Sequence, residues 1–201
     1  MSRRSDIILV FSAKVKFCTL LFGALLSISV AGQTVSLVGE SYNARECLSA
    51  ATRVAESQNV RFEDIQVCAN AIELERLNTR DLVATLINRG IIYTALGQVD
   101  NASEDYEAAR RIDNSVAAIY LNRGNLWLVS GEYGRAIEDY TRALELELDR
   151  PEVALLNRGL AYEYQSDRTQ AQRDYRDSLV ILPEWPEALR KLARVESRGF
   201  E

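Results

Sequence analysis

The sequence contains no histidine among its 201 residues. Histidine is the commonest general base near neutral pH and the commonest metal ligand. The sequence also has no glycine-rich phosphate loop, no nucleophile elbow and no cluster of metal ligands. Its many carboxylates are expected to lie on solvated helix faces. We therefore predict a binding protein without enzymatic activity, cofactor or metal.

Proline and glycine are scarce, with 3 and 10 residues, and basic residues are outnumbered by acidic ones, 24 to 29. Low glycine and proline exclude collagen-like and linker-dominated chains, and a hydrophobic fraction of 47% argues against wholesale disorder. Nucleic-acid binding depends on lysine and arginine neutralising phosphates. A net charge of -5 therefore argues against a nucleic-acid partner.

Residues 1–32 differ from the rest and are predicted to be a secretory signal peptide. A basic start precedes an uncharged run at 17–30, which ends at the small-x-small site Ser29-Val30-Ala31. The run is shorter than the ~20 apolar residues of a membrane-spanning helix, so we expect no membrane span after cleavage. An uncleaved anchor is the alternative. We predict an exported protein, in a bacterial periplasm, with a flexible segment at 33–44.

The sequence has only three cysteines, and Cys18 lies within the predicted signal peptide. Cys47 and Cys68 remain as one pair, which is expected to form a disulfide in an oxidising compartment. The alternative is a pair of small buried thiols. Two thiols without histidine are a poor metal site.

One pattern recurs three times along the chain. Asn-Arg-Gly occurs at intervals of 34 and 35 residues, as Asn88-Arg89-Gly90, Asn122-Arg123-Gly124 and Asn157-Arg158-Gly159. An alanine follows each glycine by twelve residues, and a tyrosine follows four residues later: Ala102 and Tyr106, Ala136 and Tyr140, Ala171 and Tyr175. Spacings of three and four place residues on one face of a helix. The pattern predicts two helices per repeat, with turns at 96–98, 130–132 and 165–167.

A glycine inside a helix costs about 1 kcal/mol relative to alanine. Its presence in all three repeats indicates that the paired helix approaches too closely for a Cβ atom. The alanine column has the same interpretation.

These columns resemble the tetratricopeptide repeat, whose pattern is a small residue, an aromatic three positions later, and then A-x3-F/Y. The resemblance implies an all-α, right-handed α-solenoid of antiparallel helix pairs. It departs from the family where arginine replaces the usual leucine before each glycine. The predicted repeat domain spans 45–198, divided into a degenerate repeat at 45–78, repeats at 83–116, 117–151 and 152–185, and a C-terminal capping helix at 186–198. In the degenerate repeat, Asp64 and Cys68 occupy the alanine and tyrosine columns, which places the two cysteines on paired helices. Ala71 occupies the column of small residues that follow each tyrosine by three positions, Ala109, Ala143 and Ser178.

At about 100° per residue, each repeated asparagine points away from the helix that the glycine faces. In the resembled family this direction lines a concave surface that receives peptides. The resemblance therefore implies a non-enzymatic protein-interaction module, or scaffold, that docks a protein or peptide segment in this groove. The candidate partner-binding residues are Asn88, Asn122, Asn157, Ile87, Ile91, Leu121, Asn125, Leu156 and Leu160.

An asparagine amide has both a donor and an acceptor, so this face could hold a peptide backbone whatever its side chains. Two alternatives remain open. The asparagines could satisfy only structural groups, or residues 33–44 could cover the face. Family members that bind acidic C-terminal tails carry lysine and arginine here. The corresponding residues of this chain are Ala84, Ile87, Ala118, Leu121, Val153 and Leu156, so such a tail is not expected.

An aspartate follows each repeated arginine by sixteen residues: Arg89 and Asp105, Arg123 and Asp139, Arg158 and Asp174. We predict a partly buried ion pair in every repeat, because arginine can bind a carboxylate through two parallel hydrogen bonds. The alternative function for the chain as a whole is a structural or self-associating adaptor of a cell-envelope complex.

Overall fold

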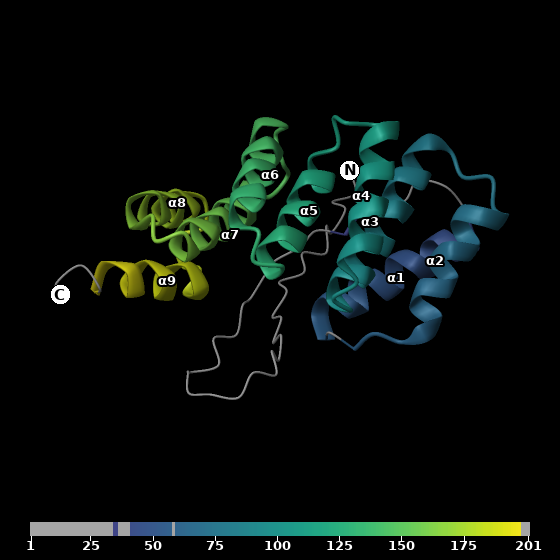
Figure 1. Cartoon of the computed structure of the whole chain (residues 1–201), viewed down its shortest axis with the longest axis horizontal. Helices are drawn as coiled ribbons and strands as arrows, with labels where there is room; N and C mark the ends of the chain where they lie inside the picture. The colour runs from purple at the N-terminus through teal and green to yellow at the C-terminus, as the bar shows by residue number, and fades with distance from the viewer. Residues whose placement is uncertain (1–33, 36–40, 58, 198–201) are drawn as a thin grey trace, which may run out of the picture.

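The computed structural model describes residues 34–35, 41–57 and 59–197. The predicted signal peptide lies outside these residues. Within them the chain is α-helical and contains no strand (Figure 1). The helices are α1 (Tyr42–Ser57), α2 (Phe62–Leu74), α3 (Thr79–Ala95), α4 (Val99–Ile112), α5 (Ala117–Val129), α6 (Tyr133–Glu145), α7 (Pro151–Tyr164), α8 (Arg168–Ile181) and α9 (Pro186–Ser197).

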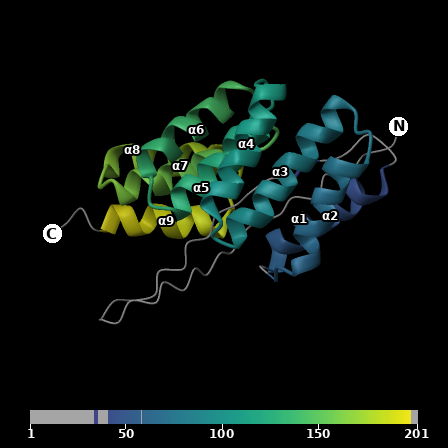
Figure 2. The same cartoon turned by 45° about the vertical axis from the view of Figure 1, so that its right-hand side comes forward.

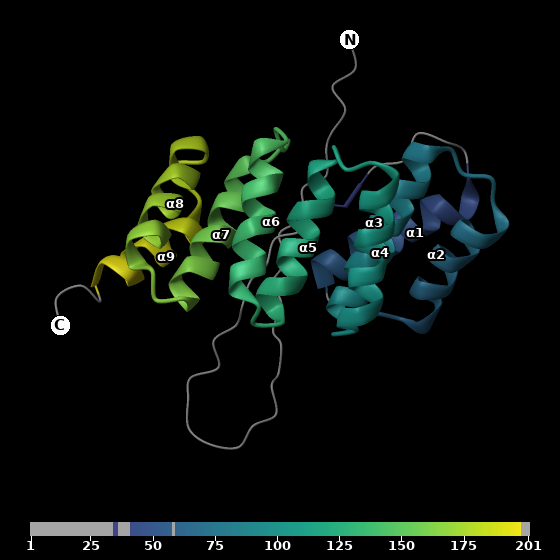
Figure 3. The same ribbon diagram turned by 45° about the horizontal axis from the view of Figure 1, so that its top comes forward.

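Consecutive helices form four pairs, α1–α2, α3–α4, α5–α6 and α7–α8, which are stacked in chain order and followed by α9 (Figures 1 and 3). Figure 2 shows the same succession from the side. The first helices of neighbouring pairs also touch, α3 against α5 and α5 against α7. The prediction of an all-α solenoid with a final helix at its C-terminal end is confirmed. Each described helix is too short or too polar to cross a bilayer.

Short turns within three of the pairs share one backbone conformation. Gly97 and Gly131 have φ angles of 71° and 81°, and Ser166 has the equivalent angle of 65°. This left-handed region commonly ends a helix and favours glycine, which has no Cβ. The turns coincide with the breaks predicted at 96–98, 130–132 and 165–167.

The repeated glycines inside α3, α5 and α7 make room for the tyrosine rings of the paired helices. A Cβ atom would lie 2.6 Å from the Tyr106 ring at Gly90, 2.7 Å from the Tyr140 ring at Gly124 and 2.8 Å from the Tyr175 ring at Gly159. All three tyrosines are fully buried. The space above each glycine is therefore filled by a side chain, whereas the sequence suggested a close approach of the two helices themselves.

Adding a methyl group at Gly124 tests this packing. We expect Gly124→Ala to lower the free energy of unfolding by up to about 2 kcal/mol, because overpacking costs about 1–3 kcal/mol and the gain in helix propensity offsets about 1 kcal/mol. Urea unfolding followed by circular dichroism measures the change. Gly134→Ala is the matched control, since the nearest atom to its new Cβ would be Gln165 Nε2 at 3.5 Å. An equal effect of both substitutions would contradict the packing argument.

The described part of the predicted flexible segment at 33–44 is structured. Helix α1 already begins at Tyr42, because the Ser41 hydroxyl accepts a hydrogen bond from the backbone N–H of Ala44 at 3.1 Å and caps the helix. Val35 packs against the main hydrophobic core. Serine is a strong capping residue, so Ser41 was a signal in the sequence that the predicted boundary overlooked.

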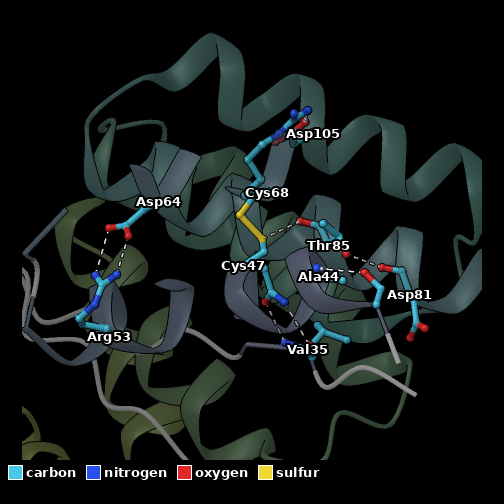
Figure 4. Close-up of a disulfide and its surroundings, with 12 residues drawn as sticks. Val35, Ala44, Cys47, Arg53, Asp64, Cys68, Asp81, Thr85 and Asp105 are labelled. Carbon is cyan, nitrogen blue, oxygen red and sulfur yellow. Dashed lines mark hydrogen bonds and ion pairs between the residues drawn. A yellow bond between two sulfur atoms is a disulfide. The ribbon is translucent and has the colours of Figure 1, made fainter. Parts of the chain in front are cut away.

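Cys47 on α1 and Cys68 on α2 face each other inside the first pair (Figure 4). Their sulfur atoms lie at disulfide distance, 2.03 Å apart, and both residues are fully buried. They form a small core with Ala50, Ala51 and Val54. Cys68 occupies the position that tyrosine fills in the later repeats.

Candidate functional site

The candidate site is the side of α3, α5 and α7 that carries the repeated asparagines, called here the asparagine face. It consists of Asn88, Asn122, Asn157, Ile87, Ile91, Leu121, Asn125, Leu156 and Leu160. All nine residues have exposed fractions between 0% and 6%. The structure thus places all nine residues on helices that contact one another, and buries their side chains. Their role in partner binding stays a prediction.

Asn88 holds a segment from far away in the chain. Its Oδ1 accepts a hydrogen bond from the backbone N–H of Val35 at 3.1 Å, and its Nδ2 donates to the backbone carbonyl of Val35 at 3.1 Å. Figures 1 and 3 show this short segment between α3 and α5, and Figure 4 draws the two hydrogen bonds at Val35 as dashed lines. One side-chain amide therefore pairs with both backbone polar groups of one residue.

The other asparagines of the face have partners on the helices themselves. Asn122 Nδ2 donates to the backbone carbonyl of Ala118 at 2.9 Å. Asn125 Oδ1 accepts from Asn157 Nδ2 and from the Tyr140 hydroxyl, each at 2.9 Å. This second arrangement joins α5 to α6 and to the next repeat. Asn125 and Asn157 thus contribute to the contact between these two repeats.

The three arginines that precede the repeated glycines each bind one aspartate on the paired helix through two hydrogen bonds. Nε and Nη2 of each arginine donate to the two carboxylate oxygens over distances of 2.7–2.8 Å, in Arg89–Asp105, Arg123–Asp139 and Arg158–Asp174. The aspartate side chains are only 2–8% exposed and the arginines 15–18%. These residues join the helices of each pair and lie apart from the asparagine face.

The same arginines also reach the preceding repeat. Arg123 pairs with Glu107, and Arg158 Nη1 donates to the Thr141 hydroxyl at 3.0 Å. The sequence interpretation missed these partners, although both stand two residues after an aspartate of the ion-pair column. The next member of that column, Arg176, donates to Glu196 of α9 at 2.7 Å. One position per repeat therefore links each unit to the next.

A further ion pair was also missed in the first helix pair. Arg53 on α1 donates to both carboxylate oxygens of Asp64 on α2, over distances of 3.0 and 2.5 Å. The separation of 11 residues differs from the 16 of the later repeats, so no column in the sequence pointed to it.

Burial and pairing set the protonation of these groups. The hydrogen bonds that Arg89 and Arg158 donate to Asp105 and Asp174 raise the pKa values of both arginines, which keeps the two guanidinium groups charged. Burial raises the pKa values of Tyr106, Tyr140 and Tyr175, so their hydroxyls remain protonated donors. Among the described residues, no three histidine, cysteine, aspartate or glutamate side chains gather where they could hold a metal ion.

Comparison with known families gives two matches, both to the model described as "Tetratricopeptide repeat". They cover residues 83–115, which contain most of α3 and all of α4, and residues 117–149, which contain α5 and α6. The search of curated protein sequences gives no match.

Several solved structures share the fold. A tetratricopeptide repeat protein from Parabacteroides merdae is 24% identical, with a TM-score of 0.62 over 79% of this chain and 61% of that one. The Arabidopsis OM64 TPR domain is 23% identical, with a TM-score of 0.57 over 60% and 99% of the two chains. The second TPR domain of human RPAP3, in complex with the HSP70 peptide SGPTIEEVD, is 23% identical, with a TM-score of 0.55 over 59% and 98%.

Proposed function

Because the chain belongs to the tetratricopeptide repeat family, we propose that it is a protein-interaction module that binds an extended partner segment on its asparagine face. The hydrogen bonds between Asn88 and Val35 are the observation that carries this proposal. They show, within the molecule, that an asparagine of this face can pair with both backbone polar groups of one residue. The module would act by binding and not by catalysis.

The spacing of the repeats suits an extended segment. Packed helices lie 8–10 Å apart, and an extended chain advances 3.3–3.6 Å per residue. A segment crossing α3, α5 and α7 would therefore advance about two to three residues from one asparagine to the next, and a step of two returns the backbone polar groups to the same side. At each asparagine it would present one backbone N–H and one carbonyl. Asn122 would exchange its bond to the Ala118 carbonyl, and Asn157 its bond to Asn125 Oδ1, for a bond to the partner, and such an exchange has little net cost.

The chemistry of the face favours an uncharged, apolar segment. The HSP70 peptide bound to the human RPAP3 domain ends in Glu-Glu-Val-Asp. In this chain the asparagines are surrounded by Ile87, Leu121 and Leu156, which offer apolar contact and no positive charge for an acidic tail. Burial of apolar partner side chains would supply most of the affinity, while the asparagines would fix the position of the backbone.

We further propose that the protein is exported and works in a bacterial periplasm. Two features support this location: the signal-like composition of residues 1–32, and a cysteine pair at disulfide distance. Mass spectrometry of the N-terminus of the protein recovered from a periplasmic fraction would test it.

Replacing the three repeated asparagines tests the binding proposal. We expect Asn88→Ala, Asn122→Ala and Asn157→Ala together to weaken binding of uncharged nine-residue peptides by at least about tenfold, since each lost hydrogen bond is worth about 1 kcal/mol. Fluorescence anisotropy with an end-blocked peptide library measures the affinity, and circular dichroism confirms that each variant is folded.

The matched control replaces three exposed asparagines, Asn59, Asn101 and Asn114, by alanine. It should bind the same peptides as the unaltered chain does. If the two triple variants bound the peptides with equal affinity, the proposal that partners bind at the asparagine face would be contradicted.

A self-associating adaptor is the second candidate function. Val180, Ile181 and Leu189 support it, because they are 80%, 47% and 47% exposed near the C-terminal end of the stack. A molar mass that rises with concentration in light scattering would favour this candidate over a monomeric peptide receptor.

A further inference from the structure

We propose that Val35 occupies the asparagine face in cis, as an internal competitor that a partner segment must displace from Asn88. This inference rests on the proposed function, because it assigns to that binding site an occupant from the same chain. Val35 precedes α1 and is 53 residues away from Asn88 in sequence, and the contact places it against α3.

The contact between Asn88 and Val35 has the geometry of pairing between neighbouring strands. In an extended chain the N–H and the carbonyl of one residue point to the same side, so a neighbouring strand can pair with both. The Asn88 amide offers one acceptor and one donor and pairs with both groups of Val35 at 3.1 Å. It therefore acts as the neighbouring strand residue would. These two bonds depend on the backbone of the bound residue and not on its side chain.

Asn88 can bind only one backbone segment in this way at a time. Asn88 is fully buried, and Val35 packs against the main core. A buried amide without hydrogen-bond partners is costly, so the state in which Asn88 has no occupant is expected to be a minor one. Because the amide has one carbonyl oxygen facing one N–H and one amino group facing one carbonyl, Val35 and a partner residue cannot bind it together in this way. The two occupants therefore compete.

Val35 competes strongly with a free partner because it belongs to the same chain. Val35 and the start of α1 are separated by only six residues, and a short tether places a linked segment at an effective concentration of about millimolar. A free partner must compete against that concentration. The apparent affinity for a partner equals the intrinsic affinity of the face multiplied by the fraction of molecules in which Val35 has left it. Loss of the cis contact should therefore strengthen partner binding without any change in the face itself.

The test uses the full chain and a fluorescent, end-blocked peptide with the sequence of residues 32–39, Gly-Gln-Thr-Val-Ser-Leu-Val-Gly. Val35→Pro in the protein removes the N–H that Asn88 accepts, and it should raise peptide affinity by at least about tenfold. Val35→Ala keeps both backbone groups and should change the affinity by less than about threefold. Adding Asn88→Ala to Val35→Pro should abolish the gain. Thermal melting shows whether each variant is folded.

Hydrogen exchange at the Val35 amide provides an independent measurement. The amide should exchange at least about tenfold more slowly in the unaltered chain than in Asn88→Ala, and addition of the peptide should remove the difference. If the peptide binds the unaltered chain and Val35→Pro equally tightly, the cis competitor is refuted while the proposed function stands. If Val35 is protected but no peptide of this or other sequence binds Val35→Pro, the proposed function fails and the competition fails with it.

Discussion

Replacing Arg123 with alanine is expected to lower the free energy of unfolding by about 3 kcal/mol, which corresponds to a fall of roughly 6–12 °C in melting temperature for a chain of this size. The substitution leaves the Asp139 carboxylate, 8% exposed, without the two hydrogen bonds from Nε and Nη2. It also removes the link to Glu107 on α4. Differential scanning calorimetry measures the change.

Arg173→Ala is the matched control for this prediction. Arg173 and Asp177 form an ion pair at 3.9 Å on the surface of α8, with exposed fractions of 74% and 50%. Exposed pairs contribute about 0–1 kcal/mol, so this variant should melt within about 4 °C of the unaltered chain. Should Arg123→Ala melt as the control does, the arginine column would have no part in holding the stack together.

Breaking the link between Cys47 and Cys68 is expected to cost about 3 kcal/mol. The two residues are 21 positions apart, and closing a loop of about that length removes this amount of free energy from the unfolded chain on the chain-entropy estimate. Urea unfolding with and without a reductant measures the loss. Alkylation followed by mass spectrometry shows whether the isolated protein contains the disulfide.

Comparison of two altered forms separates the cross-link from the packing. The reduced protein retains both sulfur side chains, whereas Cys47→Ala with Cys68→Ala also removes two fully buried atoms. We expect the alanine pair to be less stable than the reduced protein, and both to be less stable than the oxidised one. An oxidised protein that unfolds at the same urea concentration as the reduced one would contradict the entropic argument.

Contacts inside one helix pair were largely predictable from the sequence. The interval of sixteen residues between Arg123 and Asp139 is enough to place both on the facing sides of a helical hairpin, and the structure brings them within 2.8 Å. Turn positions could be predicted in the same way, because glycine marks the left-handed residue at 97 and 131. Such contacts depend on spacings that recur, so repetition itself reveals them.

Contacts between units and with the N-terminal segment were not predictable in this way. The pairing of Arg123 with Glu107 depends on how two repeats are stacked, and the spacing within one repeat does not determine that. The pairing of Asn88 with Val35 uses backbone groups, which every residue possesses, so no residue type identifies Val35 as the occupant. A tyrosine ring fills the space beside each repeated glycine, and this too could be recognised only from the positions of the side chains.

The central claim is that the asparagine face binds the backbone of an extended segment, and a pair of peptides tests it most directly. Both would have the side chains of residues 32–39, and one would carry an N-methyl group on the residue equivalent to Val35. Their dissociation constants would be measured on Val35→Pro. The account predicts binding at least about tenfold weaker for the methylated peptide, because the methyl group replaces the amide hydrogen that would be donated to Asn88 Oδ1. Equal dissociation constants for the two peptides would contradict it.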